Sequence, residues 1–182
     1  MMPFSIASET EMTGFRVTKF DPAKRGKGGC FAASEWTSVS DIGKSFAIGV
    51  LTPSEYLRIE DAYVETVRRF IASTGAGFLR VCDLELKGDG KRAPHEIMLE
   101  ASRHVGLVME GAQLSGRELD WAVRLNLREV VWCRLEGDGG LYVHFGYDYY
   151  MYVGSDAAGL VLPSLPEGMH AETMRSPYLA DQ

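Results

Sequence analysis

Hydrophobic residues recur along this chain with two different spacings, which predict its helices and strands. Across residues 53–74 apolar side chains return every three or four positions, as on one face of an α-helix. Thr52 supplies an N-cap hydroxyl, Pro53 suits the first helical position, and Glu55 follows three residues after the cap. Gly75 suits the left-handed conformation that ends many helices. We therefore expect a long helix over residues 53–74.

The other elements mix strand and helix patterns without a regular repeat. A capping box at Ser115 predicts the start of one further helix. This mixture predicts an α+β fold with a mainly antiparallel sheet, in which a C-terminal β-hairpin at about 130–153 packs against the long helix and one or two further helices. The expected strands are 15–20, 46–51, 78–86, 107–109, 130–136 and 141–153, and the further helices are 94–104 and 115–127.

The chain length and composition favour one domain over residues 1–182. With 182 residues, 46% of them hydrophobic, a chain of this kind can bury a core without disulfides or metals. Residues 1–14 form a polar lead-in, and residues 155–182, with three prolines, have the pattern of an irregular C-terminal arm.

Compartment and partner class follow from the cysteines, the apolar runs and the charge. The three cysteines are widely spaced and odd in number, which indicates reduced thiols. No secretory signal and no apolar run of about 20 residues is present, so we expect a cytoplasmic protein without a membrane span. The net charge of −6 is spread along the chain, which argues against nucleic acid and suits a basic protein partner. The one basic cluster, Lys24–Lys27, is expected to be a solvated turn.

The segment from Leu141 to Val153 is the most informative part of the chain. If it is one strand, its odd positions are apolar and its even positions are polar or aromatic. A three-residue loop, 138–140, would place Leu135 opposite Val143 and join both apolar sets. The opposite face then carries Trp132, Arg134, His144, Asp148, Tyr150 and Tyr152.

This polar and aromatic face has two interpretations. Tyr, Trp and Arg are the residue types favoured at interface hot spots, which indicates a recognition surface. Alternatively the long helix covers the face and the polar tips find buried partners. The same register predicts that Trp132 lies over Gly146, and a bulge at Gly146 would exchange the two sets of tyrosines.

Candidate chemistry is sparse. Gly43-Lys44-Ser45 ends like a phosphate-binding loop but lacks the first glycine of that motif, so Asp41 and Lys44 are interpreted as turn residues in the loop that also holds Trp36. Cys133 is expected to be a small buried hydrophobe. His144 with Asp148 or Glu136 is the one candidate acid–base pair. No metal site, cofactor or catalytic residue is expected.

Three segments resemble a group of small uncharacterised bacterial cytoplasmic proteins. They are Glu35–Gly43 (EWTSVSDIG), the helical stretch Tyr56–Tyr63, and His144–Tyr152 (HFGYDYYMY). The resemblance covers about residues 15–154. In type, these proteins look like immunity proteins of polymorphic toxin systems, which block a toxin's active site. The resemblance implies a toxin-like protein partner and carries over no catalytic residue.

Two function hypotheses follow. The first is a non-enzymatic binding protein, of the immunity type, that presents an aromatic and acidic surface to a protein partner. Its candidate binding residues are Trp36, Asp41, Trp132, Arg134, His144, Asp148, Tyr150 and Tyr152. The alternative is a small hydrolase or small-ligand-binding protein that uses His144 with a nearby carboxylate. The solvent exposure of Trp132 and His144 distinguishes these hypotheses from a purely structural role for the face.

Overall fold

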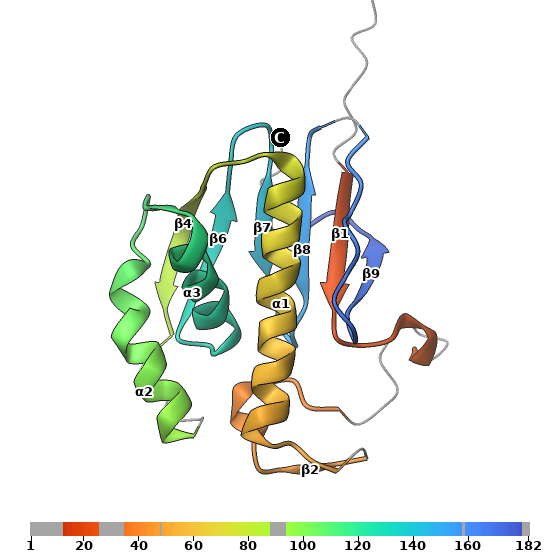
Figure 1. The fold of residues 1–182 in the computed structure, drawn as a ribbon, viewed down its shortest axis with the longest axis vertical. Helices are drawn as coiled ribbons and strands as arrows, with labels where there is room; N and C mark the ends of the chain where they lie inside the picture. Colours follow the sequence, from red (N-terminus) through yellow and green to blue (C-terminus); the bar gives the residue numbers. More distant parts are fainter. Residues whose placement is uncertain (1–12, 26–34, 48, 88–93, 158, 180–182) are drawn as a thin grey trace, which may run out of the picture.

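The fold places three helices on one face of an antiparallel sheet (Figure 1). The computed structural model describes residues 13–25, 35–47, 49–87, 94–157 and 159–179. Seven strands lie in the order β5-β4-β6-β7-β8-β1-β9, and every neighbouring pair is antiparallel. This arrangement confirms the predicted α+β class. The strands are β5 (Gln113–Leu114), β4 (Leu79–Leu86), β6 (Val131–Glu136), β7 (Tyr142–Phe145), β8 (Met151–Ser155), β1 (Thr13–Thr18) and β9 (His170–Thr173).

The three helices lie where the apolar spacing predicts them. The long helix α1 (Pro53–Thr74) crosses in front of β7 and β8, α3 (Gly116–Leu127) lies in front of β6, and α2 (His95–His104) lies outermost (Figure 1). Thr52 Oγ1 accepts a hydrogen bond from the Glu55 amide at 3.2 Å, and Gly75 ends α1 with φ of 71°. Ser115 makes no side-chain capping bond to the described residues, so the capping box predicted at α3 is wrong.

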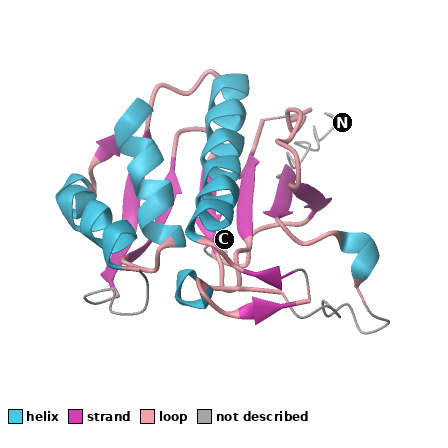
Figure 2. Ribbon diagram, turned by 60° about the horizontal axis from the view of Figure 1, so that its bottom comes forward, coloured by secondary structure: helices cyan, strands magenta, loops and turns pink. Residues whose placement is uncertain are grey.

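Two of the short predicted strands are also wrong. The strand expected at 46–51 is a separate two-stranded hairpin, β2 (Ser45–Phe46) and β3 (Gly49–Val50), which lies near the start of α1 (Figure 2). No strand forms at 107–109: Leu107 ends a 3-10 helix, η3 (Val105–Leu107), residues 108 and 109 have no regular secondary structure, and the chain joins the sheet only at β5. Short apolar runs without a clear period do not distinguish these structures. Two further 3-10 helices are η1 (Pro22–Lys24) and η2 (Val39–Asp41).

The predicted strand 141–153 is in fact two strands joined by a tight turn. β6 and β7 pair with Leu135 opposite Val143, as predicted, and β7 then pairs with β8 with His144 opposite Tyr152. Even-numbered residues of β7 pair with even-numbered residues of β8 across this turn. Each residue within these two strands therefore lies on the face of the sheet that the alternation predicts. The Trp132 indole N–H donates to the Phe145 carbonyl, next to Gly146, at 2.8 Å, and the Tyr152 ring comes within 3.2 Å of where a Cβ of Gly146 would stand.

The helix side of the sheet forms the hydrophobic core. Its strands contribute fully buried side chains such as Val81 and Val153, against which α1 packs Tyr63, Val67 and Phe70. Burying an aliphatic or aromatic side chain of this size stabilises a fold by about 1.5–3 kcal/mol. This packing fixes α1 and α3 over the sheet.

The C-terminal arm, expected to be irregular, is partly ordered as a strand. β9 pairs with β1 at the edge of the sheet, with Arg16 opposite Glu172. Beyond β9 the Met174 amide donates to the Gly14 carbonyl at 2.9 Å, so the chain turns back over the sheet face opposite the helices. Residues 174–179, here named the cover segment, lie on that face. Residues 1–12 of the predicted lead-in lie outside the described residues, and Thr13 and Gly14 already belong to β1.

Candidate functional site

A cleft of roughly 790 Å³ opens at one end of the sheet. It lies between the loop around η2, the C-terminal end of α3 and the turn that joins β7 to β8. Three of the predicted binding residues, Trp132, Asp148 and Tyr150, line it. The full lining comprises Thr37, Ser38, Val39, Ser40, Lys87, Asn126, Leu127, Arg128, Glu129, Val131, Trp132, Phe145, Gly146, Tyr147, Asp148, Tyr149 and Tyr150.

The turn between β7 and β8 has an unusual backbone for its residue types. Asp148 and Tyr149 have φ of 56° and 62°, the left-handed region that L side chains other than Asn and Asp rarely enter. The Tyr150 amide donates to the Tyr147 carbonyl at 3.1 Å, and the Gly146 amide donates to the Tyr150 carbonyl at 2.7 Å. Such a conformation at tyrosine persists only where the surroundings impose it.

The side chain of Tyr149 supplies that constraint. Its ring is 5% exposed and lies edge-on to Trp36 and Tyr63, with ring centres 5.0 and 5.9 Å away. The Tyr63 hydroxyl donates to the Tyr149 carbonyl, and the Tyr149 hydroxyl donates to the Leu127 carbonyl at 2.8 Å. The backbone and ring are therefore both fixed, and the turn presents Tyr147, whose side chain is 84% exposed, from a rigid base.

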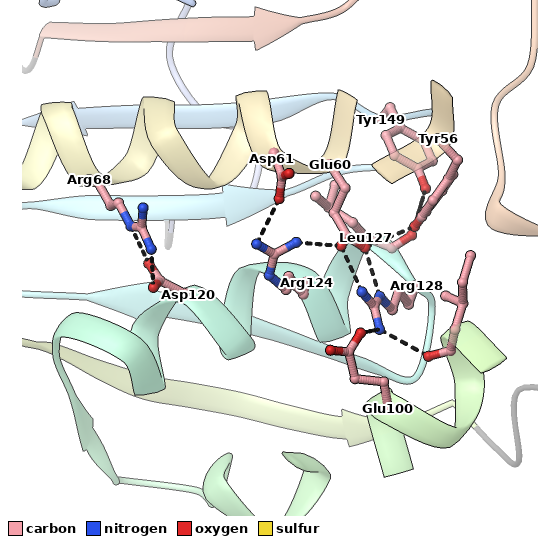
Figure 3. Close-up of polar contacts among 11 residues, drawn as sticks. Tyr56, Glu60, Asp61, Arg68, Glu100, Asp120, Arg124, Leu127, Arg128 and Tyr149 are labelled. Atoms are coloured by element: carbon pink, nitrogen blue, oxygen red, sulfur yellow. Dashed lines mark hydrogen bonds and ion pairs between the residues drawn. The ribbon is translucent and has the colours of Figure 1, made fainter. Parts of the chain in front are cut away.

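A buried ion-pair network lies behind the cleft (Figure 3). Glu60 of α1 is completely buried and receives both arms of Arg128, with Nε–Oε1 at 2.7 Å and Nη2–Oε2 at 2.8 Å. Arg124 adds a third bond to Glu60 at 2.6 Å, and the Tyr56 hydroxyl lies 3.2 Å from the same carboxylate. The Tyr149 hydroxyl is 3.0 Å from that of Tyr56, so the network connects α1 and α3 to the turn.

Sequence reasoning missed this network, although one signal pointed to it. Glu60 lies four residues after Tyr56 and three before Tyr63, within the stripe that faces the core. A carboxylate in that position requires a buried cation. Arg128 comes 68 residues later, so its pairing depends on how α3 packs against α1. Burial raises the pKa of the Tyr56 hydroxyl well above its usual value, and the neighbouring Glu60 carboxylate adds to this effect.

The polar face of the sheet lies under the cover segment, not under the long helix. The Tyr178 ring contacts Trp132 and Tyr152, with ring centres 5.6 and 6.1 Å away. Arg134 Nη1 donates to the Tyr178 carbonyl at 2.9 Å, and Arg134 Nη2 also pairs with Asp83 at 2.6 Å. The interpretation that this face lies under α1 is therefore wrong, since α1 packs on the apolar face.

His144 is fully enclosed beneath the cover segment. Its Nδ1 lies 2.8 Å from Ser176 Oγ, its ring stacks on Tyr142, and its Nε2 lies 3.4 Å from Glu136 Oε1. Burial, reinforced by the positive charge of Arg134, lowers the pKa of His144 from 6.5 to about 3. The imidazole is therefore neutral at physiological pH and does not line the cleft.

The remaining predicted residues serve local structure. Trp36 is 3% exposed and packs between Tyr149 and Lys19, whose Nζ lies 4.1 Å from the indole ring centre. Asp41 accepts bonds from the Thr37 and Ser38 amides, at 2.9 and 3.1 Å, and closes the capping box of η2. The predicted binding residues therefore fall into three groups: residues that line the cleft, residues on the sheet face beneath the cover segment, and residues that stabilise their own loops.

Other chemistry in the described part of the chain is limited. Burial raises the pKa of the Cys133 thiol to about 11, which makes it a poor nucleophile. Cys82 is also a free thiol, and Cys30 lies outside the described residues. Among the residues that the structure describes, no three His, Cys, Asp or Glu side chains gather in a way that would hold a metal ion.

Comparison with known proteins adds no further assignment. Neither the protein-family models, nor the curated proteins, nor the solved structures give a significant match to this chain. Within the described ranges, no helix is both long and apolar enough to cross a membrane.

Proposed function

We propose that this protein is a non-enzymatic binding protein of the immunity type, which recognises a toxin-like protein partner through the cleft and its rim. The recognition residues are Trp132, Tyr147, Asp148 and Tyr150. Tyrosine and tryptophan are enriched at interface hot spots, and rigid presentation lowers the entropy cost of binding. Asp148 adds an exposed carboxylate to the rim, which suits a basic partner surface.

One observation carries this proposal. Tyr147 is 84% exposed, yet it stands on a turn whose backbone is fixed by the buried ring and carbonyl of Tyr149. A large aromatic side chain held in solvent by a strained and fully supported turn is an arrangement suited to contacting another molecule.

The cleft volume also supports a second candidate function, binding of a small molecule. A volume of about 790 Å³ lies within the range of about 300–1,000 Å³ that is common for small-molecule sites. We assign no acid–base role to His144 in this alternative, because the histidine is buried away from the cleft.

The test is recovery of the partner from extracts of the native host with four matched baits. The wild-type protein and Val161→Ala should recover the same protein, since Val161 is 75% exposed and does not line the cleft. Tyr147→Ala and Asp148→Asn should lose it, and Asn keeps the left-handed turn accessible. Co-expression of the wild type should then neutralise the toxicity of the recovered partner.

Two outcomes would contradict the proposal. One is repeated recovery of the protein alone, and the other is equal recovery of a partner by the cleft variants and by Val161→Ala. Quenching of Trp132 fluorescence by a metabolite fraction, with no protein recovered, would favour the small-molecule alternative.

A further inference from the structure

Two arginines converge on one carboxylate at the edge of the polar face. Arg16 of β1 and Arg25, which follows η1, both place Nη2 on the same oxygen of Glu172, at 2.8 and 2.6 Å. The two arginine side chains are 15% and 14% exposed, and that of Glu172 is 30% exposed. Arg25 is therefore not solvated, which corrects the expectation for this residue of the basic cluster 24–27, whereas Lys24 is exposed.

The charges in this cluster do not balance. Two guanidinium groups, which stay protonated at all relevant pH values, face one carboxylate and leave one positive charge in excess. The Nε atoms of both arginines are buried and have no hydrogen-bond partner in the described part of the chain. Buried donors without an acceptor are uncommon and costly, and they often mark the place of a water or an ion.

The walls of the cluster suit an anion. The Tyr150 ring lies under the Arg16 guanidinium, with its centre 4.9 Å from Cζ, and Tyr152 is the register partner of Arg16 on β8. His170, two residues before Glu172, is on the same face of β9. The excess positive charge therefore lies on the polar face beside Tyr150, in a protein whose net charge is −6.

We propose that Arg16 and Arg25 form a binding site for a phosphate-type oxyanion, next to Glu172. Phosphate has enough acceptor oxygens to receive two N–H groups from each guanidinium fork, whereas the single Glu172 oxygen accepts only one from each arginine. Glu172, the most exposed of the three side chains, occupies part of the site and competes with the ligand. The inference concerns β1, β9 and Arg25, and it does not depend on the proposed protein partner.

The test is calorimetric titration of the full chain with inorganic phosphate at constant ionic strength. We expect saturable binding with a dissociation constant of about 1 mM or tighter. Glu172→Gln should tighten binding at least about threefold, because it removes the competing charge. Arg25→Gln should weaken it at least about tenfold, and Arg25→Lys should recover only part of the loss, since lysine lacks the planar fork. Acetate, titrated in parallel, distinguishes phosphate from a simple carboxylate and should bind more weakly.

Arg58→Gln is the matched control. It removes the same charge from an exposed pair with Glu55 on α1 and should leave phosphate binding unchanged. The proposal is overturned if neither the wild type nor Glu172→Gln binds phosphate saturably. It is also overturned if Arg25→Gln, shown to be folded by circular dichroism, binds phosphate as the wild type does.

Discussion

The two faces of the seven-stranded sheet are both buried at their centre, but by different means. The helix side buries aliphatic and aromatic side chains under α1 and α3, and its charged group, Glu60, is held by Arg124 and Arg128. The opposite side buries tyrosines and His144 under a cover segment of six residues. The two faces therefore differ both in the side chains that they bury and in the segments that cover them.

The difference is clearest in how each face satisfies its buried ionisable group. Both carboxylate oxygens of Glu60 accept hydrogen bonds from arginine. Of the two ring nitrogens of His144, Nδ1 contacts Ser176, whereas Nε2 has no hydrogen-bond partner in the described chain. We infer that the helix side holds the fold together and that the covered side is more easily rearranged. Four predictions test this contrast, from the largest expected effect to the smallest.

Breaking the network on the helix side should cost most. Glu60→Gln leaves Arg128, whose side chain is 1% exposed, with only the half-exposed Glu100 carboxylate as counter-ion, at 3.3 Å, so we expect a loss of about 3–5 kcal/mol in the free energy of unfolding. Urea denaturation followed by circular dichroism measures this loss. Glu55→Gln, which breaks an exposed pair on the same helix, should cost no more than about 1 kcal/mol. Similar losses in the two variants would refute a special role for the buried network.

Crowding the covered side should have the next largest effect. Tyr142 lies across Gly154 of β8, and a Cβ on Gly154 would stand 2.3 Å from the tyrosine hydroxyl oxygen and 2.6 Å from the Thr13 carbonyl oxygen of β1. We expect Gly154→Ala to cost about 1–3 kcal/mol because the ring and the β1 backbone must both move. Gly77→Ala, where a Cβ meets no atom within 4 Å, is the control and should change stability by less than about 0.5 kcal/mol.

A coupled substitution sharpens the same prediction. In a Tyr142→Ala background the Gly154→Ala change should cost less than in the wild type, because the ring that it displaces is gone. Additive losses in the double variant would show that Tyr142 is not what restricts position 154.

His144 should make the covered side sensitive to mild acid. The folded protein holds this pKa near 3, below the unfolded value of 6.5, so the unfolded chain binds the proton more readily. The stabilising contribution is complete well above pH 6.5 and is lost as the pH falls through 6.5, with a slope that approaches about 1.4 kcal/mol per pH unit at lower pH. In urea denaturation across this pH range, the free energy of unfolding of His144→Asn should depend less steeply on pH than that of the wild type. An unchanged slope in that variant would argue against the prediction, with the exposed His95→Gln as control.

Loosening the cover segment should have the smallest effect of the four. Ser176→Ala removes the hydrogen bond to His144 Nδ1, and we expect a loss of about 1 kcal/mol. The indole of Trp132, which contacts Tyr178, should change its fluorescence in this variant. Ser164→Ala is the control, because its exposed position uses only the backbone carbonyl, in a bond from Arg69. Identical fluorescence in both variants would count against a role for Ser176 in closing the face.

Local patterns were sufficient to predict the helices and the division of the sheet into two faces. The caps and apolar stripe of α1 depend on residues within a few positions of each other, so they can be read directly. Within β7 and β8, the face on which each side chain lies was predicted correctly. A turn interrupts the segment, but it preserves the alternation of side chains between the two faces.

The rest depends on contacts between distant parts of the chain. The turn at Asp148 and Tyr149 carries no glycine, since packing against Trp36 and Tyr63 imposes its conformation. Prolines beyond residue 155 indicate an irregular arm, but its cover segment docks through side chains more than 30 positions away, such as His144 with Ser176. The cleft likewise joins η2, α3 and the β7–β8 turn, which no local pattern connects.

The position of β1 has a consequence for the order in which the chain acquires its structure. This first strand lies between β8 and β9, and its contacts include Arg16 with Glu172, 156 residues apart. During synthesis β1 has no neighbour to pair with until residues 151–173 have left the ribosome. Such long-range pairing slows folding, and a nascent chain with an unpaired strand is exposed to aggregation. The part of the sheet formed by β8, β1 and β9 can therefore assemble only after β8 and β9 have been synthesised, so β1 stays unpaired while the intervening segments are made.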